Sequence, residues 1–162
     1  MDQATLKSWL VYHPETGAFT WAQSRSQGKG RIGTVAGCQR SDGYVSIKLF
    51  RRSYLASRLA MLYMTGEMPE AVDHIDRNSS NNRWANLRVC TIPQNGWNRP
   101  KQRNNTSGFK GVTWHAAKQK WQASTEHLGK RIHLGRFATP EEAAEAYERA
   151  VKTLHGEFVC TT

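Results

Sequence analysis

A helix with well-defined ends near the C-terminus, ATPEEAAEAYERAVKTLHG, constrains the fold more than any other part of the sequence. Thr139 and Glu142 have the spacing of a capping box, Pro140 occupies the first helical position, and Gly156 follows the last turn. Apolar residues recur at three- and four-residue steps and form one stripe: Ala143, Tyr147, Ala150 and Leu154. Because such a stripe has to cover another apolar surface, we expect this helix to pack on a sheet.

Three segments ahead of the helix can supply that sheet. FKGVTWH, KWQASTEH and KRIHLGRF alternate polar and apolar residues, which predicts three short strands. Six positions share the inward face in this pattern: Val112, Trp114, Trp121, Ala123, Ile132 and Leu134. Trp114 and Trp121 are therefore predicted to belong to the core.

The first seventy residues predict a second set of short elements. Leu6, Trp9, Leu10 and Val11 have helical spacing, and the turn HPETG follows them. Strands are predicted for AFTW at 18–21, GTVAG at 33–37 and YVSIKLF at 44–50. The Arg51-Arg52 pair is predicted to turn into a further strand, and SYLASRLAMLYMTG to form a helix that ends at Gly66.

The middle of the chain predicts a strand, a long loop, a strand and a helix. AVDHI is followed by the polar loop DRNSSNNRWAN, by LRVC, and by a helix that Thr91 caps ahead of Ile92 and Pro93. The basic stretch that follows has no apolar periodicity and is typical of a linker. We therefore expect an α+β fold with a first domain at 1–98, made of 1–70 and a ββα unit at 71–98, a linker at 99–106 and a second domain at 107–162.

The charge of the chain favours a polyanionic partner. Lysine and arginine number 23 against 13 acidic residues, which gives a net charge of +10. Such an excess is typical of proteins that bind nucleic acid through phosphate contacts, although it can also serve solubility alone. The linker residues Lys101 and Arg103 are candidates for such contacts.

The same inspection argues against several other classes of protein. Cys38, Cys90 and Cys160 are odd in number and widely spaced, so we expect neither a disulfide framework nor a structural zinc site. No run of apolar residues reaches the length of a membrane span, and the first residues lack the apolar core of a signal peptide. The sequence therefore predicts a cytoplasmic protein with reduced thiols and no membrane partner.

The segment VDHIDRNSSNNRWANLRVCTIPQN carries residues suited to phosphodiester hydrolysis. His74 can accept a proton from water near neutral pH. A divalent cation prefers oxygen ligands, which Asp73 and Asn95 can supply, while Asn86 is placed to tie the loop together. Two alternatives stay open from the residues alone: Asn98 in place of Asn95, and Asp76 as a second carboxylate ligand. The remaining loop asparagines are expected to form turns: Asn78, Asn81 and Asn82.

VDHID…NNRWANLR…TIPQN resembles the HNH nuclease motif, in the variant that ends in asparagine. The resemblance implies a ββα-metal fold in which His74 is the general base, Asp73 and Asn95 bind one metal ion, and Asn86 fixes the loop. It also implies that the ion is Mg²⁺, with Mn²⁺ able to substitute.

The segment upstream, GYVSIKLFRRSYLASRLAMLYMTGEMP, is similar to phage-encoded members of the same family, in which a histidine usually stands where this chain has Ser57. The neighbouring Arg58 matches the family pattern and is a candidate phosphate contact. Arg83, in the loop of the motif, is a further candidate DNA contact.

The last fifty residues resemble the plant ethylene-response-factor (AP2) domain through GVTW, KW, LGRF and TPEEAAEAYERA. The resemblance implies that the outer face of the sheet lies in the major groove of duplex DNA. Its candidate contacts are Lys110, Thr113, His115, Lys120, Gln122, Ser124, Glu126, Arg131 and His133. Lysines would mostly touch phosphate, whereas Gln122 and Arg131 can read base edges.

Together these features predict an HNH DNA endonuclease of the phage or homing type, acting on double-stranded DNA as a monomer or homodimer. One predicted active site in each chain implies that a monomer nicks DNA. The alternative is a sequence-specific DNA-binding regulator whose HNH module is inactive.

Overall fold

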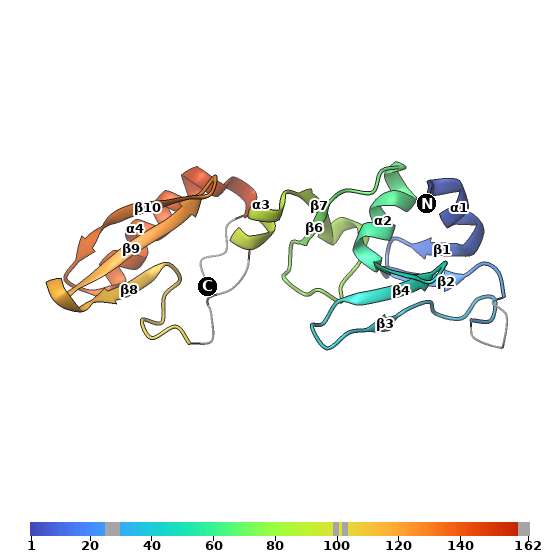
Figure 1. The fold of residues 1–162 in the computed structure, drawn as a ribbon, viewed down its shortest axis with the longest axis horizontal. Coiled ribbons are helices and arrows are strands. Elements are labelled where there is room, and N and C mark those ends of the chain that lie inside the picture. The colour runs from blue at the N-terminus through green and yellow to red at the C-terminus, as the bar shows by residue number, and fades with distance from the viewer. Residues whose placement is uncertain (25–29, 99–100, 102–103, 159–162) are drawn as a thin grey trace. The chain divides into compact units, whose positions relative to one another are not determined.

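The computed structural model describes residues 1–24, 30–98, 101 and 104–158. The chain divides into two compact units, Met1–Thr91 and Ile92–Thr162, whose relative positions are not determined. Both units combine short helices with small antiparallel sheets (Figure 1), so the chain is a mixed α and β protein.

The first unit contains three small sheets and two helices. Its elements are α1 (Gln3–Trp9), β1 (Leu10–His13), β2 (Ala18–Trp21), β3 (Cys38–Gln39), β4 (Val45–Leu49), β5 (Arg52–Leu55), α2 (Ala56–Thr65), β6 (Ala71–His74), the 3-10 helix η2 (Trp84–Asn86) and β7 (Leu87–Cys90). β1 pairs with β2, β4 lies between β3 and β5, and β6 pairs with β7, all antiparallel. β6 and β7 place Asp73 opposite Arg88 and His74 opposite Leu87.

One apolar core joins these elements. Leu6 of α1, Phe19 of β2, Ile47 of β4 and Leu59 of α2 are almost completely buried. Each such side chain contributes about 1.5–3 kcal/mol when it leaves water. Helix α2 contacts β4, β5 and β6, so the same core supports the strand that carries Asp73 and His74.

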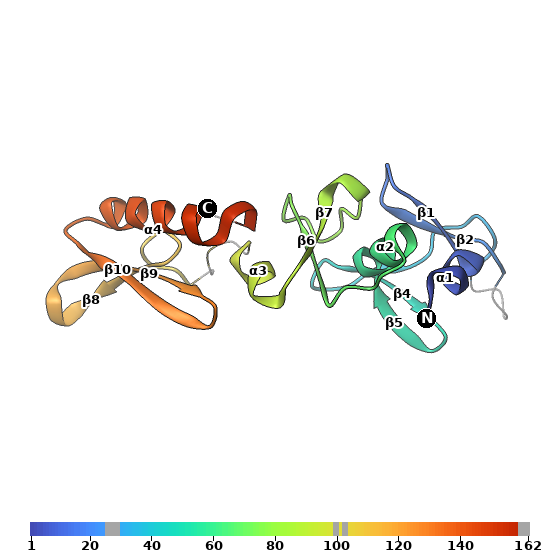
Figure 2. The ribbon, with the colours of Figure 1, turned by 90° about the horizontal axis from the view of Figure 1, so that it is seen from above.

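The second unit consists of a sheet, its covering helix and a short leading helix. Its elements are α3 (Ile92–Trp97), β8 (Val112–His115), η3 (Ala116–Lys118), β9 (Lys120–His127), β10 (Lys130–Phe137), α4 (Pro140–His155) and η4 (Gly156–Phe158). The strand order is β10-β9-β8, and α4 runs along one face of this sheet (Figure 2). The Thr139 hydroxyl accepts a hydrogen bond from the Glu142 amide and caps α4. Val112, Ala123 and Tyr147 lie in the core between the two layers.

Several predictions for the first unit are wrong at the ends of elements. Leu10 and Val11 belong to β1 and not to the helix, because the chain turns into the hairpin directly after Trp9. GTVAG forms no strand, although Val35 bridges to Thr20 and the segment makes backbone hydrogen bonds with Phe19 and Trp21 of β2. The turn into β5 is made by Phe50 and Arg51, which have φ values of 47° and 65°, so Arg52 already belongs to the strand.

Two predictions for the core of the second unit are also wrong. Trp114 is 48% exposed, although it shares a face of the sheet with the buried Val112. Along α4, Ala150 and Leu154 are only half-buried, whereas Val151 and His155 are buried. Alternation predicts the face on which a side chain lies but not how far the covering helix extends over that face.

No helix in the described ranges is long and apolar enough to cross a bilayer. Of the cysteines in those ranges, Cys38 is exposed and Cys90 is buried, and neither forms a disulfide.

Candidate functional site

His74 lies at the end of β6 and is held by an asparagine from the following loop. Its side chain is buried, and its Nε2 lies 3.1 Å from Oδ1 of Asn82, which is also buried. The ring of Tyr44 meets the imidazole edge-on, with 5.9 Å between the ring centroids. The imidazole therefore has a defined position within the first unit.

Asp73 precedes His74 and forms an ion pair across the β6–β7 ladder. The Arg88 guanidinium donates to Asp73 Oδ2 through Nε at 2.8 Å and through Nη2 at 2.7 Å. The two side chains are only 17% and 5% exposed, respectively. A carboxylate buried to this extent needs such a partner to offset its lost hydration.

Asn86 binds the loop that joins β6 to β7 at several points. Its Oδ1 accepts a hydrogen bond from the Asp76 amide at 3.0 Å, and its Nδ2 donates to the Asp76 carboxylate at 2.9 Å and to the Asn81 carbonyl at 2.8 Å. In addition, its backbone carbonyl accepts from the Ile75 amide at 2.9 Å. Asn86 thus joins the start of the loop to its end.

Asp76 belongs to the same hydrogen-bonded loop. Burial raises the pKa of its carboxyl, but hydrogen bonds from Asn81, Asn78 and Asn86 and the charge of His74 outweigh this and lower the pKa below 3.8. The structure therefore uses this carboxylate, which the sequence left open as a metal ligand, to receive hydrogen bonds within the loop.

Asn95 and Asn98 both belong to the second unit. Asn95 is a half-buried residue of α3, and Asn98 is a buried residue directly after it. Among the described residues, no group of three or more His, Cys, Asp or Glu side chains could hold a metal ion. A metal site built from this part of the chain would therefore need asparagine oxygens beside the carboxylate.

Sequence reasoning missed Asn82, which was expected to form a turn. Asn82 is one of four asparagines in the segment from Asn78 to Asn86, and nothing in the order of these residues marks the one that reaches the histidine. Its burial, at 3% exposed, is the signal that separates it from the half-buried Asn81 beside it. Only the path of the loop in space reveals this contact.

Helix α3 is packed within the second unit through Trp97. The Trp97 ring stacks on that of His155 with 4.0 Å between centroids, and it lies 5.3 Å from that of His127. The Lys110 ammonium donates to the Trp97 carbonyl at 2.7 Å. His155 in turn donates from Nε2 to the Glu126 carbonyl at 3.0 Å, which ties the end of α4 to β9.

The face of the sheet opposite α4 carries most of the predicted DNA contacts. Its polar side chains lie in cross-strand pairs: Thr113 with Gln122, His115 with Lys120, Ser124 with His133, and Glu126 with Arg131. The other residues of these pairs are exposed or half-buried, but Ser124 is buried. Its hydroxyl accepts hydrogen bonds from Arg131 Nε at 3.2 Å and Nη2 at 3.0 Å.

A residue that the sequence analysis left out also lies on this face. The register of β10 shifts between His133 and Gly135, so that Arg136 pairs with Gln122. Paired residues of antiparallel strands share a face, so the exposed Arg136 joins the row formed by Thr113 and Gln122. Simple alternation from Arg131 places Arg136 on the helix side, and an irregularity of this kind has no clear signal in the sequence.

The candidate contacts outside this face have different surroundings. Arg58 is half-buried and donates from Nε to the Pro69 carbonyl at 2.9 Å, whereas Arg83 is exposed. The Lys101 ammonium donates to the Gly108 carbonyl at 2.7 Å. Arg103 lies outside the described residues.

Comparison with known proteins matches two segments of the chain to families. Residues 54–97 match the family described as HNH endonuclease. Protein 3.8 of Escherichia phage T7 is 34% identical over 95 residues, which cover 57% of this chain and 78% of the phage protein. An uncharacterized HNH endonuclease, L560, of Acanthamoeba polyphaga mimivirus is 34% identical over 99 residues, or 60% of this chain and 50% of that protein. No solved structure gives a significant match.

The C-terminal residues 107–157 match the AP2 domain. The AP2-like ethylene-responsive transcription factor AIL7 of Arabidopsis thaliana is 44% identical over 50 residues, which cover 30% of this chain and 10% of the plant protein. The HNH match contains Asp73, His74, Asn86 and Asn95, and the AP2 match contains the whole sheet and α4. The chain therefore belongs to the HNH endonuclease family and carries an AP2 domain behind its HNH segment.

Proposed function

We propose that the protein is a metal-dependent DNA endonuclease of the phage or homing type. The HNH segment hydrolyses phosphodiesters of duplex DNA, and the AP2 domain contributes recognition of the site. The observation that carries this proposal is the buried imidazole of His74 next to the buried carboxylate of Asp73, inside the HNH segment.

The proposed domains extend beyond the two family matches, which cover residues 54–97 and 107–157. Residues 1–98 act as the nuclease domain, with a ββα-metal core at 71–98, and residues 107–162 act as the reader behind a linker at 99–106. Strand β6, its loop, β7 and α3 follow one another in the order that such a core requires.

The donor set of the proposed metal site suits a hard cation. Asp73 supplies a carboxylate and Asn95 an amide oxygen, and oxygen ligands of this kind favour Mg²⁺, with Mn²⁺ able to substitute. Arg88 donates to Oδ2 of Asp73 and orients the carboxylate in the β6–β7 ladder. When bound, the cation would stabilise the charge that develops on the leaving oxygen.

In this mechanism His74 is the general base. Its imidazole takes a proton from a water molecule while the water oxygen bonds to phosphorus, the bond from phosphorus to the 3′ oxygen breaks, and this oxygen takes a proton from solvent. Asn86 keeps the loop closed around the base through its bonds to Asp76 and Asn81. Each chain would cut one strand, so a double-strand break would need two chains or two successive events.

Nicking of supercoiled plasmid by the purified full chain tests the proposal. Nicking should require Mg²⁺ or Mn²⁺ and stop in EDTA. His74→Ala should nick about 10²–10⁴-fold more slowly, because it lacks the positioned base, while it binds duplex DNA as the wild type does. If His74→Ala nicks at the wild-type rate, the HNH assignment of roles is wrong and the DNA-binding regulator becomes the better description.

Variants of the ligands extend the same assay. Asp73→Ala should lose activity with partial recovery at high metal concentration, whereas Asp42→Ala, which breaks an exposed pair with Arg40, should behave as wild type. Asn95→Asp keeps an oxygen ligand and should retain part of the activity that Asn95→Ala loses. Asn98→Asp and Asn98→Ala test whether Asn98 is the ligand in place of Asn95. The metal ligand is the asparagine at which the aspartate variant retains activity and the alanine variant does not.

A further inference from the structure

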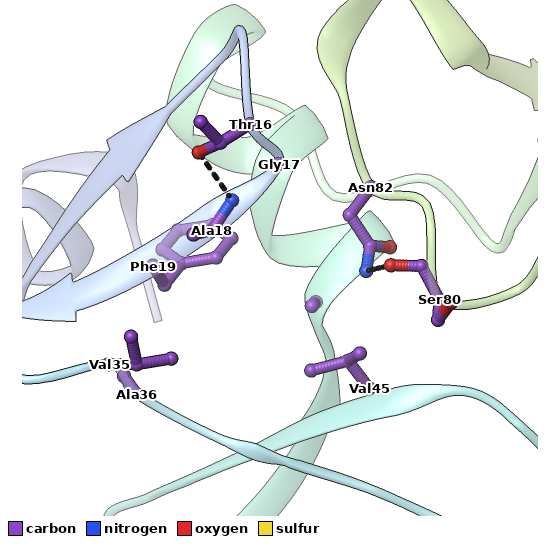
Figure 3. Close-up of a pocket in the computed structure, with 10 residues that line it drawn as sticks. Thr16, Gly17, Ala18, Phe19, Val35, Ala36, Val45, Ser80 and Asn82 are labelled. Atoms are coloured by element: carbon purple, nitrogen blue, oxygen red, sulfur yellow. Dashed lines mark hydrogen bonds between the residues drawn. The ribbon is translucent and has the colours of Figure 1, made fainter.

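The Asn82 side chain can be oriented without ambiguity. Its Nδ2 donates to the Ser80 carbonyl at 3.2 Å, and a carbonyl cannot donate in return. The amide nitrogen therefore points to Ser80, as the close-up in Figure 3 shows, and the amide oxygen points to His74. Because Oδ1 can only accept, the His74 Nε2 atom at 3.1 Å has to carry the hydrogen.

This contact determines the tautomer of the base. A neutral imidazole carries one hydrogen, so a hydrogen on Nε2 leaves the lone pair on Nδ1. The tautomer with the hydrogen on Nδ1 would bring two lone pairs together between buried groups, which costs free energy because no water replaces the lost bond. Asn82 thus favours the form of His74 that accepts a proton at Nδ1.

The N-terminal hairpin holds Asn82 in place. The Tyr12 hydroxyl donates to the Asn82 carbonyl at 2.7 Å, inside the core and seventy residues away in sequence. Burial raises the pKa of Tyr12 to about 12, so the hydroxyl remains a donor at any pH at which a nuclease would act.

The turn of the hairpin also touches the backbone of this loop. A Cβ at Gly17 would lie only 2.7 Å from the Asn82 carbonyl oxygen, and Gly17 has a φ of 74°, so only glycine fits there. The Trp84 amide donates to the Pro14 carbonyl at 3.0 Å on the same side of the loop. Gly17 and Asn82 both line a cavity of about 200 Å³ beside this close backbone approach (Figure 3).

We propose that Asn82 is a positioning residue that fixes His74 as a base acting through Nδ1, and that the hairpin of β1 and β2 fixes Asn82 through Tyr12 and Gly17. The assignment of the base rests on the proposed function, whereas the tautomer does not. The hairpin, which lies outside the HNH match, becomes part of what the nuclease centre needs.

Nitrogen NMR of the full chain labelled at histidine tests the tautomer without any assay of activity. In metal-free wild type at pH 8, His74 should show the hydrogen on Nε2. Asn82→Leu, of similar size but without the acceptor, should show a mixture, and Asn82→Asp, which keeps the acceptor, should show Nε2–H again. Finding the hydrogen on Nδ1 of wild-type His74 overturns the proposal whether or not the protein cuts DNA.

Steady-state nicking tests the role in the reaction. Outer-shell partners of metal-ligating histidines contribute about 10- to 100-fold to activity, and we expect Asn82→Leu to lower kcat by a similar factor with KM unchanged. Asn82→Asp should recover most of the rate, which a purely structural role would not predict. Tyr12→Phe should lower kcat several-fold, and Asn81→Leu, one position away on the loop, provides the comparison for general damage to the loop.

The outcomes separate the two claims. If wild type does not nick but has the Nε2–H tautomer, the proposed function fails and the orienting role of Asn82 stands. If wild type nicks and Asn82→Leu has the same kcat, the positioning role fails and the nuclease stands. Should Asn82→Leu not fold, the wild-type tautomer and the kcat of Tyr12→Phe decide, and an unchanged kcat in Tyr12→Phe removes the hairpin from the proposal.

Discussion

Three polar residues of the first unit, His74, Asp73 and Asn86, are each held by a different kind of partner. A side-chain amide orients His74, a guanidinium pairs with Asp73, and two backbone groups together with the Asp76 carboxylate hold Asn86. The sequence predicts the two strands AVDHI and LRVC but not their register, so the pairing of Asp73 with Arg88 is known only from the structure. The contact between His74 and Asn82 depends on the path of an irregular loop, for which hydrophobic periodicity gives no information.

The first prediction concerns the buried ion pair. Arg88→Met leaves the Asp73 carboxylate uncompensated, and breaking such a pair costs about 3–5 kcal/mol. Because Arg88 is 17% exposed, we expect a loss near the lower end. The free energy of unfolding in EDTA, followed through the NMR signals of Trp9, Trp21 and Trp84, measures it.

A matched control is available on the surface of the same unit. Arg40→Met breaks the pair with Asp42, whose partners are 52% and 45% exposed, and should cost less than about 1 kcal/mol. The double variant Asp73→Leu/Arg88→Met should recover much of the loss, because it leaves no buried charge. Equal effects of Arg88→Met and Arg40→Met would contradict the role assigned to the Asp73 pair.

At the scale of elements, regular patterns predicted the strands well and their irregularities poorly. β2, β7, β9 and β10 have the predicted bounds. The shift in β10 is invisible to alternation, and it moves Arg136 to the outer face. Trp114 is exposed because α4 does not cover this part of the sheet, which the pattern of the strand alone cannot reveal.

The second prediction follows from the irregularity of β10. If the outer face of the sheet lies in the major groove, Arg136 can read a guanine, and such a contact contributes about 1–3 kcal/mol of discrimination. Arg136→Ala should therefore lose the preference at one position among duplexes selected from a random library. Arg149→Ala, on the opposite layer and 74% exposed, should select the wild-type sequence. Selection of one unchanged sequence by both variants would exclude Arg136 from base recognition.

The third prediction concerns the end of α4. Burial lowers the pKa of His155 below 6.5. The hydrogen bond to the Glu126 carbonyl raises the pKa, but the charges of His127 and Lys110 lower it further, and the net shift is downward. When the pKa of a histidine is lower in the folded protein than in the unfolded chain, the unfolded chain takes up the proton first as the pH falls. The free energy of unfolding therefore keeps its full value above the unfolded pKa and decreases as the pH falls through the folded pKa. The second unit should thus lose stability as the pH falls below about 6.5.

Comparison with a variant isolates this effect. His155→Phe keeps a ring against Trp97 but does not titrate, so its thermal midpoint should depend less on pH than that of wild type between pH 8 and pH 5. The midpoint of the second unit can be followed through the Trp97 signal. Parallel curves for the two proteins would show that His155 is not the group responsible.

At the scale of the whole molecule, the net charge of +10 predicts how binding responds to salt. The logarithm of the binding constant should fall linearly with the logarithm of the salt concentration, with a slope of about −0.9 for each phosphate neutralised. Lys120→Ala should reduce the magnitude of this slope by about 0.9, the value for one phosphate, on any duplex. Lys152→Ala, on α4, should leave the slope unchanged. Titration of labelled duplex by anisotropy at several salt concentrations measures both, and a flat dependence would contradict phosphate binding.

The packing of α3 has a consequence for recombination between genes of this kind. Trp97 stacks on the ring of His155, and Lys110 binds its carbonyl, so the last helix of the HNH segment has its contacts with the AP2 domain. If recombination within residues 99–106 replaced the AP2 domain by another, Trp97 would face a surface without the partners His155 and Lys110 that it contacts here. A hybrid enzyme with a new reader should therefore keep α3, which carries the proposed ligand Asn95, and should also keep the residues that pack on Trp97, so that the helix and its aromatic partners are inherited together.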